Sequence, residues 1–180
     1  MPAKPPRATF HHGDTRRTAI EAALALVTQD GREALGFRAV AERIGVNHRA
    51  LYRHFASLEA LKVEVAAIGF HRLADALEKM PRGELRALGR AYARFAFAEP
   101  NLYDLMFALP LRQWHGDHSS LGPAMRRVIA AAVAAVGTKD AQAQVFRLWG
   151  LAHGLIGLYR AGAWRARSDR QAIRFIAGLV

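Results

Sequence analysis

Apolar residues recur at helical spacing along most of the chain, with polar residues between them. In the clearest stretch, Phe37, Val40, Ala41 and Ile44 lie at i, i+3, i+4 and i+7, which places them on one face of a helix. No sustained alternation of apolar and polar residues bounded by turns predicts a strand. We therefore predict an all-α fold of about nine helices. They are expected near residues 14–29, 37–44, 47–55, 57–81, 83–98, 101–109, 121–136, 140–161 and from 168 to the C-terminus.

The segment 37–55 predicts two short helices joined by a sharp turn. Gly45 suits the turn because it adopts a left-handed conformation without a Cβ clash. Asn47 suits the cap of the next helix, and Leu51 and Phe55, four residues apart, form its buried face. The opposite face carries side chains that donate hydrogen bonds or positive charge: His48, Arg49, Tyr52, Arg53 and His54. This combination is typical of a helix that reads the major groove of double-stranded DNA.

Breaks in the pattern divide the chain into three parts. Residues 1–13 hold three prolines and basic side chains, and they predict a flexible basic arm. A three-helix head follows over residues 14–56, with Asp14 as the expected first cap and Gly31 as the stop. A larger helical body fills residues 57–180. In the body, Ser57 and Thr138 are expected to cap helices, Pro100 to begin one, and Ser168 with Gln171 to form a capping box.

Charge and cysteine content narrow the choice of partner and of cellular location. The 180 residues carry a formal net charge of +11 and no cysteine, which favours a polyanionic partner and a reducing, cytoplasmic location. Residues 1–62 hold 10 basic and 6 acidic side chains and the rest hold 16 and 9, so charge alone does not locate the partner. No apolar run is long enough to span a membrane, and the N-terminus is not expected to be a secretory signal.

Residues 39–61 resemble the DNA-binding domain of TetR-family transcriptional regulators. The resemblance lies in Val40-Ala-Glu-Arg-Ile-Gly-Val46, Ala50-Leu-Tyr-Arg-His-Phe55 and Ser57-Leu-Glu-Ala-Leu61. A weaker resemblance, in the motifs Pro100–Phe107 and Trp149–Gly154, points to a subfamily with a Trp and His-Gly signature. The resemblance implies a homodimer that binds a palindromic operator, acts as a repressor or an activator, and is released by a small ligand.

The same resemblance implies roles for the head. Tyr52 and His54 would contact phosphates, and His48, Arg49 and Ala50 would face base edges, with Arg49 suited to a guanine. Arg38 would hold the DNA backbone, and Asn47 and Arg53 complete the predicted DNA-binding set. Two positions depart from the family pattern: Leu58 stands where a lysine is common, which removes a phosphate contact, and Gly36 replaces a polar cap. For the N-terminal arm, a solvated tail is favoured over a minor-groove contact.

The body is rich in aromatic and methionine side chains, which predict a core that also encloses an apolar ligand pocket. Tyr103, Trp149 and His153 are the expected polar handles, and Met106 and Phe107 are expected beside them. Trp149 and His153 are four residues apart and so share a helix face. A purely structural role for His153, bonded to a neighbouring helix, remains the alternative.

The resemblance further implies that the last two long helices form the dimer interface. The candidates are Ala152, Leu155, Ile156, Tyr159, Ile173 and Ile176, with the monomer's own core as the alternative position for each. Gly150, Gly154 and Gly157 indicate a close helix–helix approach or room for a ligand, because glycine is costly inside a helix.

Other chemistry has little support. The pair His11-His12 and the group His115, Asp117 and His118 lack the pattern of a metal site, so we predict no metal and no cofactor. No catalytic motif is present, so we predict that the protein is not an enzyme. Two alternatives stay open: a helical adaptor that binds protein without DNA affinity, and an all-α enzyme that uses His153.

Overall fold

The computed structural model describes residues 12–110 and 119–179, and every regular element within them is helical. The described part contains nine α-helices, as predicted, and a short 3-10 helix. They are α1 (His12–Asp30), η1 (Arg32–Ala34), α2 (Phe37–Ile44), α3 (His48–Leu51), α4 (Leu58–Glu78), α5 (Leu85–Ala98), α6 (Pro100–Ala108), α7 (Leu121–Val136), α8 (Ala141–Arg160) and α9 (Asp169–Leu179).

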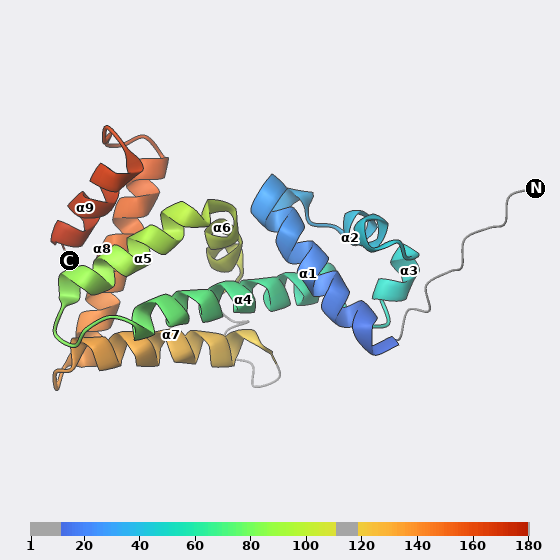
Figure 1. Cartoon of the computed structure of the whole chain (residues 1–180), viewed down its shortest axis with the longest axis horizontal. Coiled ribbons are helices and arrows are strands. Elements are labelled where there is room, and N and C mark those ends of the chain that lie inside the picture. Colours follow the sequence, from blue (N-terminus) through green and yellow to red (C-terminus); the bar gives the residue numbers. More distant parts are fainter. Residues whose placement is uncertain (1–11, 111–118, 180) are drawn as a thin grey trace, which may run out of the picture.

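Helix α4 connects the two ends of the molecule. Figure 1 shows α1, α2 and α3 grouped at one end of α4, and α8 and α9 at the other. Helix α4 packs against α1, α5, α6 and α7, and α6 also contacts α1. The head and the body therefore meet through two elements, α4 and α6.

The helices begin and end largely where local chemistry predicts. Gly45 ends α2 with a φ of 71°, and the Asn47 side chain accepts a hydrogen bond from the Arg49 N–H at 2.9 Å. Ser57 caps α4 by accepting from the Ala60 N–H at 3.1 Å. Gly36 precedes α2 without a side-chain cap, as expected of a glycine.

Three details differ from the predictions. Helix α1 begins at His12, two residues before the predicted cap position at Asp14. Thr138 does not cap α8 with its side chain, because the helix starts later and the Thr138 carbonyl accepts the Ala141 N–H at 3.2 Å. Helix α3 ends at Leu51, earlier than predicted, and the chain continues as a turn in which the His54 N–H donates to the Leu51 carbonyl at 2.9 Å.

Helix α6 approaches α4 closely at Gly69. A Cβ atom added at Gly69 would lie 2.5 Å from the Sδ and 2.9 Å from the Cγ of Met106, and 3.1 Å from the Cγ of Leu102. Met106 and Leu102 are both fully buried, so neither can move aside into solvent. The glycine is therefore what allows α6 to lie this close to α4.

We predict that Gly69→Ala destabilises the protein, although alanine is favoured over glycine inside a helix by about 1 kcal/mol. Overpacking a filled core typically costs about 1–3 kcal/mol, which exceeds or cancels that gain. The measurement is the free energy of unfolding in urea for four proteins: the wild type, Gly69→Ala, Met106→Ala and the double variant Gly69→Ala/Met106→Ala. The added methyl group should cost stability only where Met106 is present, and an equal effect in both backgrounds would contradict the predicted clash.

Candidate nucleic-acid interface and effector cavity

The head presents α3 on a small buried core. Leu51 is fully buried and Phe55 is nearly so, which holds α3 against the other helices of the head. The ring of Tyr52 packs edge-on against Phe37 with centroids 4.8 Å apart, yet 59% of the residue is exposed. The tyrosine is thus held in place from one side and free to contact a partner from the other.

The predicted DNA-binding residues all lie at or near the surface. Arg38, Asn47, Arg49, Tyr52 and Arg53 are exposed, and His48, Ala50 and His54 are half-buried. None of the residues packs inside the head, so the arrangement allows the predicted DNA contacts. The contacts themselves remain a prediction.

The arginines of the head divide into two groups. Arg16 forms an ion pair with Glu64 of α4 at 2.7 Å and lies over the ring of Phe55, and Arg43 donates to Gln29. These two arginines join elements of the protein. By contrast, Arg38, Arg49 and Arg53 form no ion pair within the described residues. Their charge is available for phosphates or base edges.

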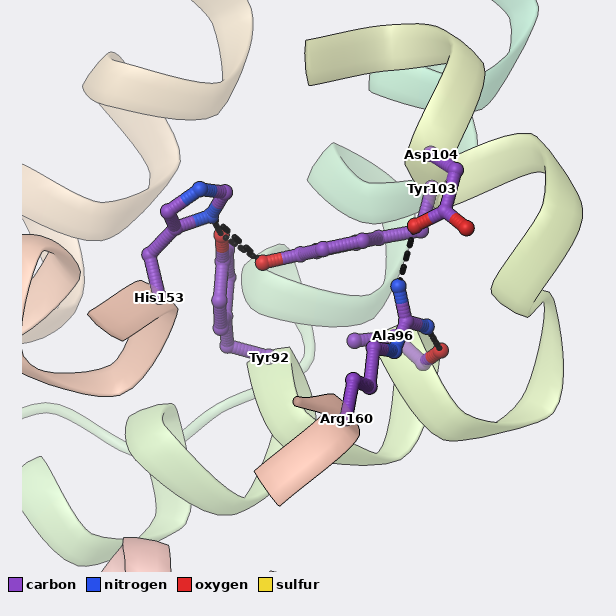
Figure 2. A network of polar contacts seen from close by, with 6 residues as sticks. All are labelled: Tyr92, Ala96, Tyr103, Asp104, His153 and Arg160. Carbon is purple, nitrogen blue, oxygen red and sulfur yellow. Dashed lines mark hydrogen bonds and ion pairs between the residues drawn. The ribbon is translucent and has the colours of Figure 1, made fainter. Parts of the chain in front are cut away.

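In the body, four side chains form a hydrogen-bonded chain across three helices. The Trp149 indole N–H donates to the Tyr92 hydroxyl at 3.0 Å. The Tyr92 and Tyr103 hydroxyls lie 3.0 Å apart, and the Tyr103 hydroxyl lies 2.5 Å from Nδ1 of His153. Figure 2 shows both tyrosine hydroxyls converging on the His153 ring.

Burial sets the protonation of this chain. Desolvation by burial, with a smaller effect of the Arg160 charge, lowers the pKa of His153 below its usual value. Burial also raises the pKa of Tyr103 to about 12 and that of Tyr92 well above its usual value. At neutral pH the imidazole is therefore uncharged, and its Nδ1 shares a hydrogen bond with the tyrosine hydroxyls.

Arg160 supports Tyr103 from the other side. It forms an ion pair with Asp104, donates to the Ala96 carbonyl at 2.8 Å, and places its guanidinium 4.9 Å from the centroid of the Tyr103 ring. Figure 2 shows Arg160 below Tyr103 and Asp104. These contacts join α8 to α5 and α6.

The hydrogen-bonded chain lies between two hollows. One is an apolar cavity of about 50 Å³ between α4, α5, α7 and α8, where Tyr92 and Trp149 bring the only polar side-chain atoms among the described lining residues. The other is an open groove of about 330 Å³ that is lined by Tyr103, Phe107, His153 and Arg160 among others. No charged side chain lines the apolar cavity.

The predicted pocket residues are thus only partly brought together. Trp149 lines the cavity, while Tyr103, Phe107 and His153 line the groove. Met106 lines neither, because it is fully buried against Gly69 of α4. Sequence reasoning missed Tyr92, although the helical period places its hydroxyl on a buried face, where a tyrosine needs a hydrogen-bond partner.

The predicted dimer residues also separate into groups. Ala152, Ile156 and Ile176 lie in the protomer's own core with at most 2% exposure, which is the alternative position named for them. Leu155, Tyr159 and Ile173 are half-buried. The large apolar side chains that α8 and α9 do expose are Phe146, Leu151, Leu158, Phe175 and Leu179. Open space surrounds the Cα atoms of Gly150, Gly154 and Gly157.

The described residues contain neither a candidate metal site nor a candidate membrane-spanning helix. Within them no group of three or more histidines or acids is arranged to hold a metal ion. No helix in this part of the chain is both long and apolar enough to cross a bilayer. The N-terminal basic residues Lys4, Arg7 and His11, and the group His115, Asp117 and His118, lie outside the described residues.

We predict that His153 makes stability depend on pH. The pKa of His153 is lower in the folded state than in the unfolded state. As pH falls below about 6.5, the unfolded chain therefore binds a proton at this residue more readily than the folded chain does. The free energy of unfolding should therefore fall as pH drops from 7.5 to 5. Urea titrations across this range should give a smaller loss for His153→Gln than for the wild type. His71→Gln, at an exposed position on α4, should keep the wild-type loss, and equal losses in all three proteins would refute the assignment.

Two family profiles match the chain. The profile described as "Tetracyclin repressor-like, C-terminal domain" matches residues 85–177, slightly more than half of the chain. The profile described as "Bacterial regulatory proteins, tetR family" matches residues 19–65, which include α2 and α3.

Two curated relatives are HTH-type transcriptional regulators. The one from Mycobacterium tuberculosis is 23% identical over 155 residues, covering 82% of this chain and 71% of the relative. The one from Bacillus subtilis is 28% identical over 97 residues, 51% of each protein. The latter match therefore spans about half the length of that relative.

Solved structures share the fold over nearly the whole chain. A protein of unknown function from Rhodococcus sp. RHA1 has a TM-score of 0.74 and 25% identity, with 96% of both chains covered. A TetR transcriptional regulator from the same organism has a TM-score of 0.67 and 22% identity, with 94% of this chain and 97% of that one covered. A transcriptional regulator from Saccharomonospora viridis, solved in complex with choline, has a TM-score of 0.64, 16% identity, and coverage of 93% and 95%.

Proposed function

Because the chain belongs to the tetR family of bacterial regulatory proteins, we propose that it is a DNA-binding transcriptional repressor. In this proposal a homodimer binds a palindromic operator through α3 of each protomer. A small, largely apolar molecule that enters the body releases the operator. The observation that carries the proposal is the exposed surface of α3 and its following turn, where Arg49, Tyr52 and Arg53 face solvent and the two arginines form no ion pair within the described residues.

The lining of the apolar cavity favours an uncharged effector, and its volume of about 50 Å³ means that the helices around it must move apart to admit one. Its lining includes no charged side chain, and burying an ion without a partner is costly. The Trp149 N–H is already bonded to Tyr92, so an apolar molecule leaves no donor of that pair unsatisfied. The Saccharomonospora relative is in complex with choline, a cation. For the present chain we favour a neutral molecule, because no carboxylate lines its cavity.

Helix α6 provides a route from the cavity to the head. Tyr103 of α6 belongs to the hydrogen-bonded chain beside the cavity. Asn101, on the same helix, donates to the Thr28 carbonyl near the end of α1 at 3.0 Å, and Met106 rests against Gly69 of α4. An effector that moves the bonded pair of Tyr92 and Trp149 together would shift α6, and both α1 and α4 would follow. The effector can weaken operator binding by no more than the ratio of its affinities for the released and the DNA-bound conformations.

The exposed apolar residues of α8 and α9 support a dimer through these helices. Figure 1 shows the two helices together at the end of the molecule away from the head. Leu158 and Phe175 are 51% and 50% exposed, and the glycines of α8 would let a partner helix approach closely. This face replaces the buried Ala152, Ile156 and Ile176 of the original prediction. No catalytic role is proposed for His153, since its Nδ1 is occupied by the tyrosines.

We predict that Leu158→Arg converts the dimer into monomers, because it would place a charge in an apolar interface. The mass in solution, measured by light scattering after size exclusion, should halve at micromolar concentration. Gln142→Arg adds the same charge at an exposed position of α8 on a different side of the helix, and it should leave the mass unchanged. A dimer that persists in Leu158→Arg would place the interface elsewhere.

Footprinting on the DNA that flanks its own gene tests the function as a whole, and we expect a protected palindrome. On that operator, Tyr52→Ala should weaken binding to specific and non-specific DNA alike, because the loss is a phosphate contact. Arg49→Ala should reduce discrimination at particular base pairs by about 1–3 kcal/mol. The readout is the affinity for the operator and for single-base variants at fixed salt.

The matched control is Arg86→Ala, which removes an exposed arginine of α5 in the body. It should leave both affinity and discrimination near the wild-type values. If Tyr52→Ala and Arg49→Ala lowered affinity equally for every sequence, the assignment of base reading to Arg49 would be wrong. If the protein had no salt-sensitive affinity for DNA at all, a protein-binding adaptor would replace the regulator.

A further inference from the structure

A third hollow of the body lies on the surface between α4 and α5, apart from the cavity beside Trp149 and the groove beside His153. Its volume is about 500 Å³, within the range of small-molecule sites. Apolar side chains form most of it: four alanines together with Met80 and Phe95. None of its lining residues belongs to the apolar cavity or to the groove beside His153.

Three cations complete the lining of this α4/α5 groove: Lys79, Arg90 and Arg94. All three are exposed, and none forms an ion pair within the described residues. Arg90 and Arg94 are four residues apart on α5, so their like charges repel each other. A bound anion would remove this repulsion.

The acids nearby are already paired with other cations. On α4, Asp75 and Glu78 both bind Arg127 of α7, at 2.6 and 2.7 Å. At the end of α5, Glu99 binds Arg72 at 2.6 Å. Within the described residues no acidic side chain lines the groove, so none of them neutralises its positive charge.

From this juxtaposition we infer that the α4/α5 groove binds an anionic amphiphile, an aliphatic chain that ends in a carboxylate. The chain lies along the alanines, Met80 and Phe95, and the carboxylate is held by Arg90 and Arg94, whose guanidinium groups suit a planar anion. The apolar lining favours such a molecule over a nucleic acid, whose recognition requires charge and base contacts along the surface. This site is separate from the cavity proposed for the effector, and its existence does not depend on DNA binding.

Titration calorimetry on the full-length chain tests the inference, with laurate as the probe at concentrations below those that form micelles. Dodecanol, which has the same chain without the charge, is the matched probe. We expect laurate to bind more tightly than dodecanol, and added salt to reduce this difference because the cations are exposed. Equal affinities for the two probes would overturn the assignment of the carboxylate to the arginines.

Variants locate the site. Arg90→Gln/Arg94→Gln should weaken laurate by about tenfold or more, as expected for losing charge-assisted hydrogen bonds, and should leave dodecanol unchanged. Arg126→Gln/Arg170→Gln removes the same charge at exposed positions outside the groove and should leave laurate binding intact. Ala87→Trp, which fills the groove, should weaken both probes. Wild-type laurate affinity in either groove variant would refute the proposed site.

Discussion

The contact between Met106 of α6 and Gly69 of α4 is the constraint on which the arrangement of head and body depends. Because glycine has no side chain, α6 lies close enough to α4 for Met106 to be fully buried there. That position puts Tyr103 within hydrogen-bond reach of His153 and Asn101 within reach of the Thr28 carbonyl. Packed interfaces of this kind shift between discrete arrangements and do not deform continuously. A small displacement of α6 therefore affects both ends of the molecule.

The basic side chains of the described residues fall into a paired and an unpaired group. Several arginines join helices to one another through acids, as Arg16 does with Glu64 and Arg127 with Glu78. Exposed pairs of this type contribute little stability individually, but they neutralise the surface locally. The cations without such partners in the described residues include those beside α3 and those in the α4/α5 groove. They also include exposed arginines elsewhere in the body, such as Arg86, Arg126 and Arg170. Unpaired charge therefore supports an anionic partner at the two proposed places only together with their geometry.

Helix α8 serves three purposes with three sets of side chains. Trp149 and His153 face the hydrogen-bonded chain, and Ile156 fills the core. Leu151 and Leu158 remain exposed beside the glycines. Helical periodicity alone identifies α8 as long and apolar, but a helix that is apolar on every side does not reveal which face meets which neighbour. This explains why Ala152 and Ile156 were expected at a dimer interface and are found in the core.

The sequence was sufficient to predict those features that depend on a few neighbouring residues. The left-handed Gly45, the Asn47 and Ser57 caps and the exposed Tyr52 follow from the sequence, because each depends on contacts within about one helical turn. Other features depend on residues tens of positions away in the sequence. These features are the place of Tyr92 at the centre of the polar network, the separation of cavity from groove, and the lack of an acidic partner for Arg90 and Arg94 in the described residues. These distant residues meet only when whole helices pack against one another. The helical period and the composition do not determine which helices pack together.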